Sequence, residues 1–196
     1  MARRREQRLL LRGGWRKTNG VYLDFYDIAA DSCAIDSSLS KRLGFKKIFV
    51  INKDIRAVGR GDENRQITER SIAFGRAQDQ LLALVKNGAS AVAITDSYID
   101  RKLMDTIKEN KCILCMPLST ITASYGVERA RNIYRMRKLF ADARKRGIEV
   151  CFISMAKTTQ FLNSYMQLIE LARLVGADER YARYSTSEIT KALVEE

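Results

Sequence analysis

The order of apolar runs and helical segments is the feature that most constrains the fold of this chain. Short runs rich in β-branched or aromatic residues alternate with segments of helical period along most of the sequence. We expect strands at residues 22–26, 47–51, 71–74, 91–95, 113–116 and 150–154. We expect helices near residues 37–43, 78–87, 101–110, 128–146 and 161–175. Strands joined by single helices run parallel, so the pattern predicts an α/β fold.

Glycines mark where several of the expected helices end. Gly44, Gly88 and Gly147 stand just before the second, fourth and sixth expected strands. A residue there turns the chain into the sheet in a left-handed conformation, which glycine adopts without strain. Residues 55–68 have no apolar period and are predicted to form a long surface loop. Six strands fit either an open doubly wound sheet or a small barrel, and periodicity does not choose between them.

Length and charge bound the class of protein. The 196 residues, 46% of them hydrophobic, suit one globular domain, and we assign it residues 21–196. The 35 basic residues exceed the 23 acidic ones by 12, and residues 1–20, with seven basic residues and one acidic residue, are predicted to be a flexible basic arm. This balance favours nucleic acid as a partner ahead of an acidic membrane surface. No segment approaches the roughly 20 apolar residues of a membrane span, so we expect a cytoplasmic protein without a membrane partner.

The residue types that usually carry catalysis are scarce. The chain has no histidine, which removes the commonest general base and the commonest ligand of catalytic zinc. Cys112 and Cys115 lie three apart on an expected strand, so their sulfurs should point to opposite faces as ordinary reduced core cysteines. Asp27 and Asp96 follow strands, where barrel enzymes keep catalytic groups, but without a base or metal beside them a structural role is favoured. We therefore expect no catalytic residue, no metal site and no cofactor bound by the protein.

Two segments are candidates for contact with RNA. Gly59-Arg60-Gly61 lacks the spacing of a phosphate-binding loop, but with Arg56 and Arg65 it could follow an RNA backbone; a solvated insertion is an equal alternative. The helix expected over residues 128–146 has two opposed stripes. The apolar stripe, expected to be buried, contains Ile133, Met136, Phe140 and Ala143. The opposite stripe contains Arg131, Arg135, Lys138 and Lys145, with Arg129 and Arg137 on its flanks.

The opposite stripe carries almost no acid, although like charges at helical spacing repel. A solvated helix usually mixes signs, so an uncompensated row indicates an anionic partner, with an ordinary exposed face as the alternative. The aromatic residues considered, such as Phe25 and Phe49, fall in expected strands, and no single-strand-reading motif is present. We therefore expect contacts to phosphate and shape, without sequence-specific readout.

Several segments together resemble a known family. They are Asp24-Phe25-Tyr26-Asp27, Leu43-Gly44-Phe45, Glu128-Arg129-Ala130-Arg131, Val150-Cys151-Phe152-Ile153-Ser154 and the helix Leu168-Ile169-Glu170-Leu171-Ala172-Arg173-Leu174-Val175-Gly176. The stretch from Asp24 onward is similar to protein component three of archaeal ribonuclease P, the thirty-kilodalton subunit family, which is related to the PHP-type phosphoesterase barrels.

The resemblance implies a TIM-like (βα) barrel without a working metal site. It implies a noncatalytic subunit that helps the ribonuclease P RNA remove the 5′ leader from pre-tRNA by endonucleolytic cleavage, with Mg²⁺ held by the RNA. It further implies a smaller companion protein, joined as a heterotetramer, and the other ribonuclease P proteins. Family-wide RNA contacts would match Arg101, Lys102, Arg129 and Arg135.

Two other functions fit the same residues. One is a metal-dependent phosphoesterase of the same barrel type that uses carboxylates alone, among them Asp27 and Asp96. The other is an RNA-binding assembly protein of a different particle.

Overall fold

Seven parallel strands form the centre of the part of the molecule that the structure describes. The computed structural model describes residues 24–30, 32–33, 35–67, 70–75, 77–94 and 99–194. The strands are β1 (Tyr26–Ala29), β2 (Lys47–Val50), β3 (Arg56–Val58), β4 (Ser71–Phe74), β5 (Ala91–Ala93), β6 (Ile113–Pro117) and β7 (Val150–Ile153). They form a two-stranded sheet, β1-β2, and a five-stranded sheet of order β3-β4-β5-β6-β7, in which every pair is parallel. The α/β class expected from the sequence is therefore confirmed.

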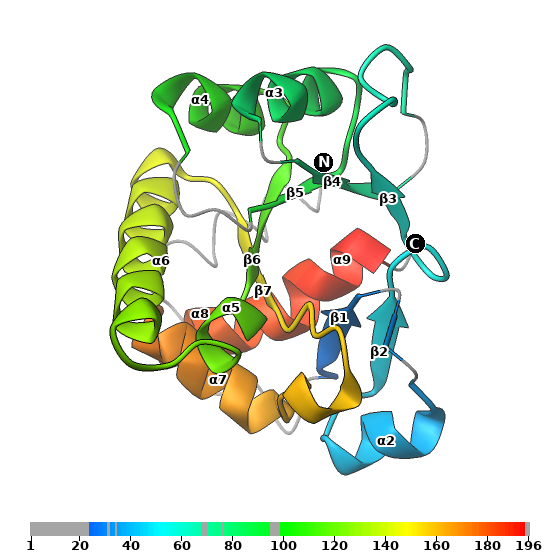
Figure 1. Ribbon diagram of the computed structural model, residues 1–196, viewed down its shortest axis with the longest axis vertical. Helices are drawn as coiled ribbons and strands as arrows, with labels where there is room; N and C mark the ends of the chain where they lie inside the picture. The colour runs from blue at the N-terminus through cyan, green and yellow to red at the C-terminus, as the bar shows by residue number, and fades with distance from the viewer. Residues whose placement is uncertain are drawn as a thin grey trace, which may run out of the picture.

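Helices pack around these strands (Figure 1). They are α2 (Ser37–Arg42), α3 (Gln78–Lys86), α4 (Arg101–Glu109), α5 (Ser119–Thr122), α6 (Gly126–Arg146), α7 (Tyr165–Leu174), α8 (Glu179–Tyr184) and α9 (Thr190–Val194). A 3₁₀ turn (Thr159–Phe161) precedes α7, and a π-helical segment, η2 (Ser185–Ile189), joins α8 to α9. Gly44, Gly88 and Gly147 have φ angles of 83°, 104° and 74°, as expected for residues that end a helix before a strand.

Both faces of the strands are buried, which explains their continuous apolar sequences. One apolar cluster contains alternate strand residues such as Ile28, Cys115 and Ile153, and α9 and η2 pack against it. The other cluster contains the intervening residues, such as Leu114 and Phe152, with the helices outside them. Because side chains alternate along a strand, each strand contributes to two cores.

Backbone hydrogen bonds also link the two sheets to each other. Ile51 and Ile55 form an isolated parallel bridge between the end of β2 and the start of β3. On the other side, Met155 N–H donates to Ile28 O at 2.8 Å, and Ala30 N–H donates to Ala156 O at 3.1 Å. The smaller sheet is thus linked to both edges of the larger sheet: β2 is linked to β3, and β1 is linked to the residues after β7.

The structure corrects two expectations about the strands. The first strand runs from Tyr26 to Ala29, so Tyr26 begins the strand that was expected to end there. The long loop predicted over residues 55–68 contains β3 at its start, and Arg56 lies on that strand. A three-residue strand with only one buried residue has too short an apolar pattern to stand out in the sequence. The expected basic arm over residues 1–20, and its boundary with the domain, lie outside the described residues.

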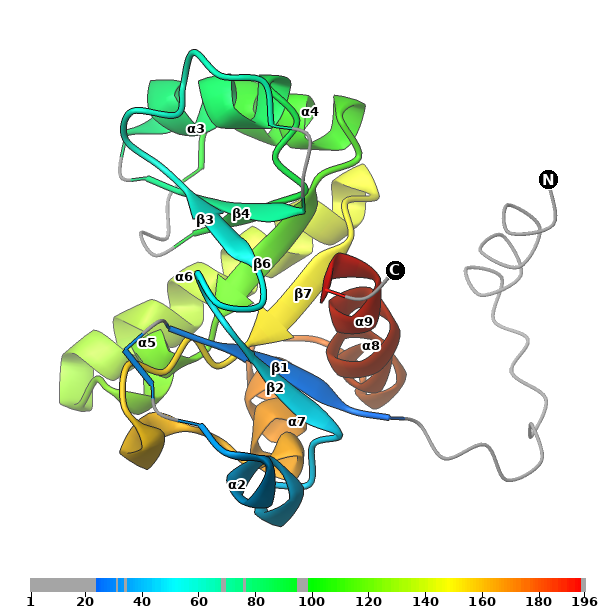
Figure 2. The same ribbon diagram turned by 90° about the vertical axis from the view of Figure 1, so that its right-hand side faces the viewer.

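The C-terminal helices protect the part of the β7 edge that no strand covers (Figure 2). The Tyr181 hydroxyl on α8 accepts a hydrogen bond from Val150 N–H at 2.8 Å. The Ser185 hydroxyl accepts from Phe152 N–H and donates to Val150 O, both at 2.9 Å. These two hydroxyls satisfy strand-edge groups that would otherwise be buried without partners.

Replacing Ser185 by alanine should therefore destabilise the fold. Phe152 N–H would lose its acceptor in a fully buried position, and a buried donor without a partner costs about 1–3 kcal/mol. Urea unfolding of Ser185→Ala should show a lower midpoint with an unchanged slope. Ser187→Ala is a matched control, because that buried hydroxyl donates to Arg183 O within its own helix. Equal stability of the two variants would contradict this account of the β7 edge.

Candidate nucleic-acid interface

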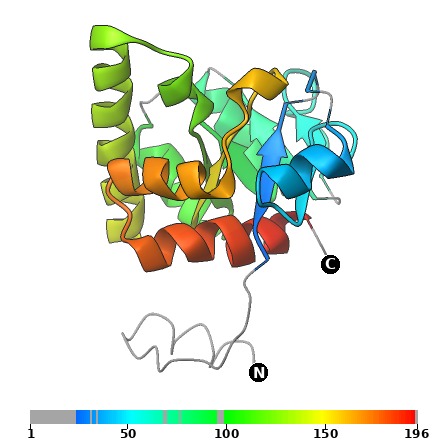
Figure 3. The ribbon, with the colours of Figure 1, turned by 90° about the horizontal axis from the view of Figure 1, so that it is seen from below.

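Helix α6 is the longest helix that the structure describes and forms one edge of the molecule (Figure 3). Met136, Leu139, Phe140 and Ala143 are its buried residues, and Ile133 is half-buried. The buried stripe was expected from the 3.6-residue period, except for Leu139. Since one face is fixed against the core, the opposite face must point into solvent.

Three arginines of α6 fix its position against neighbouring helices. Arg137 Nε donates to Leu174 O at 2.7 Å and so satisfies a carbonyl at the end of α7. The Arg144 guanidinium lies over the Tyr181 ring on α8, 4.0 Å from the ring centroid. Arg146 forms an ion pair with Asp105 on α4. No pattern in the sequence predicts these three contacts, because each partner lies more than thirty residues away along the chain.

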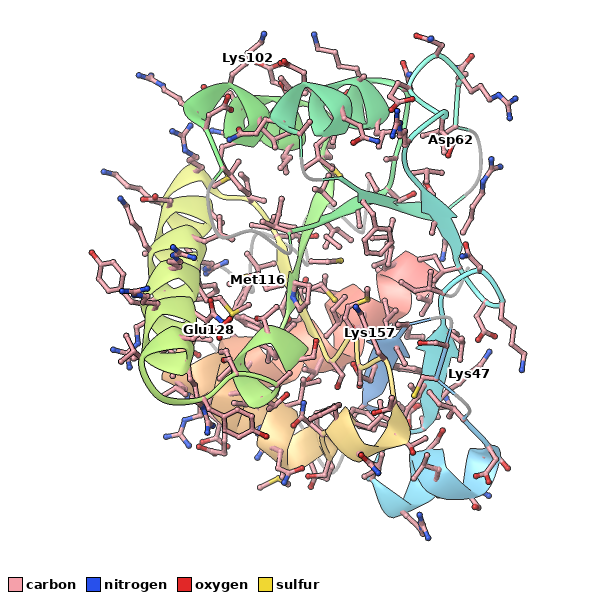
Figure 4. The ribbon with its side chains drawn as sticks, viewed as in Figure 1. Lys47, Asp62, Lys102, Met116, Glu128 and Lys157 are labelled. Atoms are coloured by element: carbon pink, nitrogen blue, oxygen red, sulfur yellow. The ribbon has the colours of Figure 1, made fainter. Side chains whose placement is uncertain are left out.

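Five other cations on α6 face solvent. They are Arg129, Arg131, Arg135, Lys138 and Lys145, and all five are exposed. Within the described part of the chain, no carboxylate lies within ion-pair distance of any of them. Figure 4 shows side chains along the outer side of α6 pointing away from the strands, with Glu128 near the start of the helix. We call these five residues the α6 ridge.

The start of α4 lies beside the far end of the α6 ridge. Arg101 and Lys102, the first two residues of α4, are both exposed there, and Figure 4 shows Lys102 at the top of the view. Arg101 approaches Asp105 at 3.7 Å, with 86% of its side chain exposed. A hollow of about 240 Å³ lies between the two helices, and Arg101 and Lys138 both line it. Its other charged residues are Asp100, Asp142 and Arg146, so it is less cationic than the α6 ridge.

The three predicted contacts near β3 lie apart from α6. Arg56, Arg60 and Arg65 are exposed. They belong to β3 and the segment after it, which lies on the opposite side of the strands from α6 (Figure 1). Arg56 approaches Asp62 at 3.7 Å. The structure therefore divides the ten sequence-predicted residues into a group of seven on α4 and α6 and a group of three near β3.

Hydrogen bonds anchor the segment after β3. Gly59 N–H donates to the Asp62 carboxylate at 3.1 Å, and Gly61 N–H donates to the Glu63 carboxylate at 2.6 Å. Ile67 N–H donates to Asn87 O at 2.7 Å and ties the segment to the end of α3. Backbone donors already bound to carboxylates cannot cradle a phosphate. The exposed side chains of Arg60 and Arg65 are not part of these contacts, so RNA contact at this segment stays a prediction beside the alternative of a solvated insertion.

The Asp27 carboxyl group makes hydrogen bonds that link two strands. Its Oδ1 accepts from Ser154 N–H at 2.7 Å and from Ile28 N–H at 2.8 Å, which joins β1 to the end of β7. Its Oδ2 is buried and has no hydrogen-bond partner among the described residues. Burial raises the pKa of Asp27 to about 6, against the opposing effect of the hydrogen bonds from Ser154 and Ile28. Asp96 lies outside the described residues.

Described residues at the ends of β1 and β2 line a hollow that contains a carboxylate. A hollow of about 490 Å³ at the ends of β1 and β2 has Asp36 as its carboxylate. Asp36 Oδ1 already accepts from Leu39 N–H at 2.6 Å as the cap of α2, and that hydrogen bond lowers the pKa of Asp36. In the ranges that the structure describes, no group of three or more His, Cys, Asp or Glu residues is placed to hold a metal ion.

The cysteines lie in the cores. Cys112 belongs to the helix-side cluster and Cys115 to the other cluster, so the prediction that they diverge is confirmed. Burial raises the pKa of Cys112 to about 12, which keeps it a neutral thiol. The sequence did not reveal that Cys115 pairs in register with Cys151 on β7. Both are free and fully buried.

Sequence comparisons identify no relative. No protein-family model matches the chain, and no curated protein matches it. Within the described residues, none of the helices combines the length and hydropathy needed to cross a membrane.

Solved structures do resemble the fold. A chain in the cryo-EM structure of archaeal ribonuclease P with mature tRNA superposes with a TM-score of 0.61 at 14% identity, covering 98% of this chain and 89% of that one. The crystal structure of A. niger ochratoxinase matches with a TM-score of 0.50 at 17% identity over 63% of this chain. A Xaa-Pro dipeptidase with bound methionine matches with a TM-score of 0.50 at 13% identity, also over 63%. The chain spans about a third of the length of these two enzymes, with 30% and 33% of them covered.

Proposed function

We propose that this chain is a noncatalytic protein subunit of ribonuclease P that binds and stabilises the RNA subunit. The observation that carries the proposal is the α6 ridge, five exposed cations without ion-pair partners in the described part of the chain. Four of them share the face opposite the buried stripe, and Arg129 is exposed at the start of the helix. Such a surface suits the phosphates of RNA, because neutralising them releases condensed counterions. The fold-level likeness to a chain of the ribonuclease P complex, which extends over nearly the whole length of both chains, supports it.

The proposal includes the form of the sheet. We infer that the seven strands make one TIM-like barrel, with the Ile51–Ile55 bridge joining β2 to β3 and the bonds of Ile28 and Ala30 joining β1 to the segment after β7. Strand order along the sequence matches neighbour order in space throughout, as in a (βα) barrel. The hydroxyls of Tyr181 and Ser185 occupy the part of β7 that a further strand would cover.

In this proposal the chemistry belongs to RNA. Mg²⁺ bound by the ribonuclease P RNA would cleave the 5′ leader of pre-tRNA, while this chain screens phosphate charge and positions the RNA. A smaller companion protein, in a heterotetramer, and the other ribonuclease P proteins would complete the particle. Asp27 supports the noncatalytic role, since its side chain is fully buried and its Oδ1 already accepts from two backbone N–H groups.

Reconstitution tests this function. Adding the full chain to ribonuclease P RNA and the companion subunits should lower the Mg²⁺ concentration required and raise the rate of pre-tRNA cleavage, because added cations reduce repulsion between RNA phosphates. Single-turnover cleavage across a Mg²⁺ series measures both. The same particle assembled without this chain is the control. Identical rates and Mg²⁺ requirements in the two particles would contradict the proposal.

A further inference from the structure

Tyr134 is a large aromatic side chain in an unusual position. It lies near the middle of α6 with 69% of its surface exposed. Most aromatic rings that the structure describes are buried or pack on one another, as Phe140 does on Phe152 with centroids 5.4 Å apart. Among the described residues, no such ring contact and no cation–π contact involves Tyr134. The core does not explain why an aromatic residue stands here.

The neighbours of Tyr134 on the helix surface are mostly cations. Residues three and four positions away lie beside a helical residue, and for Tyr134 these are Ala130, Arg131, Arg137 and Lys138. Arg131 and Lys138 belong to the α6 ridge, and they lie on the two sides of the ring along the helix axis. Arg137 is held in place by its bond to Leu174 O. The ring is thus an exposed apolar surface framed by positive charge.

A flat ring framed by cations matches the chemistry of unpaired nucleic acid. Aromatic side chains stack on the faces of unpaired bases, while nearby cations bind the phosphates on either side of the stacked nucleotide. A duplex hides its base faces, so a protein helix that contacts only the backbone of a duplex gains no affinity from an aromatic side chain. A protein partner is a poorer fit, because the cores of protein interfaces are depleted in lysine and in unpaired charge.

We propose that Tyr134 stacks on an unpaired base of RNA, with Arg131 and Lys138 binding the phosphates that flank it. This inference rests on the proposed function and deepens it, because it names an unpaired RNA segment as the ligand of the α6 ridge. It also changes the expectation from the sequence that contacts are limited to phosphate and shape. The sequence contained a usable signal, since Tyr134 lies three residues after Arg131 and four before Lys138.

Binding to two RNA probes tests the inference. With the full chain, Tyr134→Ala should weaken binding of an oligouridylate of about 12 nucleotides roughly tenfold and leave a blunt RNA duplex nearly unaffected. The salt dependence should not change, because no phosphate contact is removed. Tyr134→Phe keeps the ring and should bind both probes like the parent. Met166→Ala removes an exposed apolar side chain from α7 and should have no effect on either probe.

An Arg131→Gln variant separates failure of the inference from failure of the function. If Arg131→Gln weakens binding of both probes and Tyr134→Ala weakens neither, the stacking contact is overturned while the RNA surface stands. If neither substitution has an effect, both proposals fail. Equal weakening of oligouridylate and duplex by Tyr134→Ala also overturns the inference. The inference is also overturned if Tyr134→Ala leaves RNA affinity unchanged but abolishes self-association of the chain, because that result would assign the ring to a protein contact.

Discussion

Replacing Arg131 and Arg135 together by glutamate is expected to weaken RNA binding on the order of 100-fold at low salt. Both side chains are exposed on the α6 ridge and pair with no carboxylate in the part of the chain that the structure describes. Each reversal removes an attraction to phosphate and adds a repulsion of similar size. The slope of log K against log salt should also become shallower by about 1.4 to 1.8, because two phosphate contacts are lost.

Filter binding across a salt series measures both effects. Lys41→Glu combined with Lys191→Glu is the matched control, since it makes the same change in net charge at exposed sites on α2 and α9, away from α6. If binding depends only on net charge, the two double variants will weaken it equally, and the α6 ridge will not be a specific interface. Unfolding midpoints of both variants should stay near that of the parent, because none of the four side chains is buried.

The second large effect concerns the buried carboxyl group of Asp27. Its folded-state pKa of about 6 lies above the ordinary value of 3.8, so the folded protein holds this proton more tightly than the unfolded chain does. The resulting stability is fully present below about pH 4 and is lost as the pH rises through 6. A shift of about two units corresponds to roughly 3 kcal/mol of unfolding free energy. The buried Oδ2, which has no hydrogen-bond partner among the described residues, fits the raised pKa, because a proton on it neutralises the buried charge.

Substitution by asparagine should remove this pH dependence. Asp27→Asn keeps an oxygen that can accept from Ser154 and Ile28 but cannot ionise. Urea unfolding at pH 4 and pH 8 measures the free energy of unfolding of both proteins. From pH 4 to pH 8, the value for Asp27→Asn should rise by about 3 kcal/mol relative to that of the parent. Asp142→Asn, at an exposed carboxylate of α6, should show no such gain. Parallel pH profiles of Asp27→Asn and the parent would contradict the assignment.

Much of the fold could be predicted from local pattern. The strand at Ser71–Phe74 and the starts of α3 and α4 lie at the expected residues, because their apolar periods and flanking stops are clear. β3 was missed because three residues with one buried side chain give no period. The helices after residue 175 were also missed, since their buried faces include serine and threonine, such as Ser185 and Thr190, which look like surface residues in the sequence.

The candidate site was predictable in part for a similar reason. Spacing along α6 separated most of its buried stripe from most of its cations, because a helix repeats every 3.6 residues whatever surrounds it, but it missed the buried Leu139. Spacing could not tell which arginines are engaged. Arg137, Arg144 and Arg146 bind groups on α7, α8 and α4, and those groups approach only when the chain has folded.

The sequence by itself determined the α/β class, the helix-ending glycines and the two faces of α6, because each depends on contacts or conformations within a few residues. The tertiary structure alone decided the place of β3, the partners of Asp27 and the separation of Arg56, Arg60 and Arg65 from the α6 ridge. These features depend on segments far apart in the chain, and their geometry is fixed only when the two cores on either side of the strands are packed.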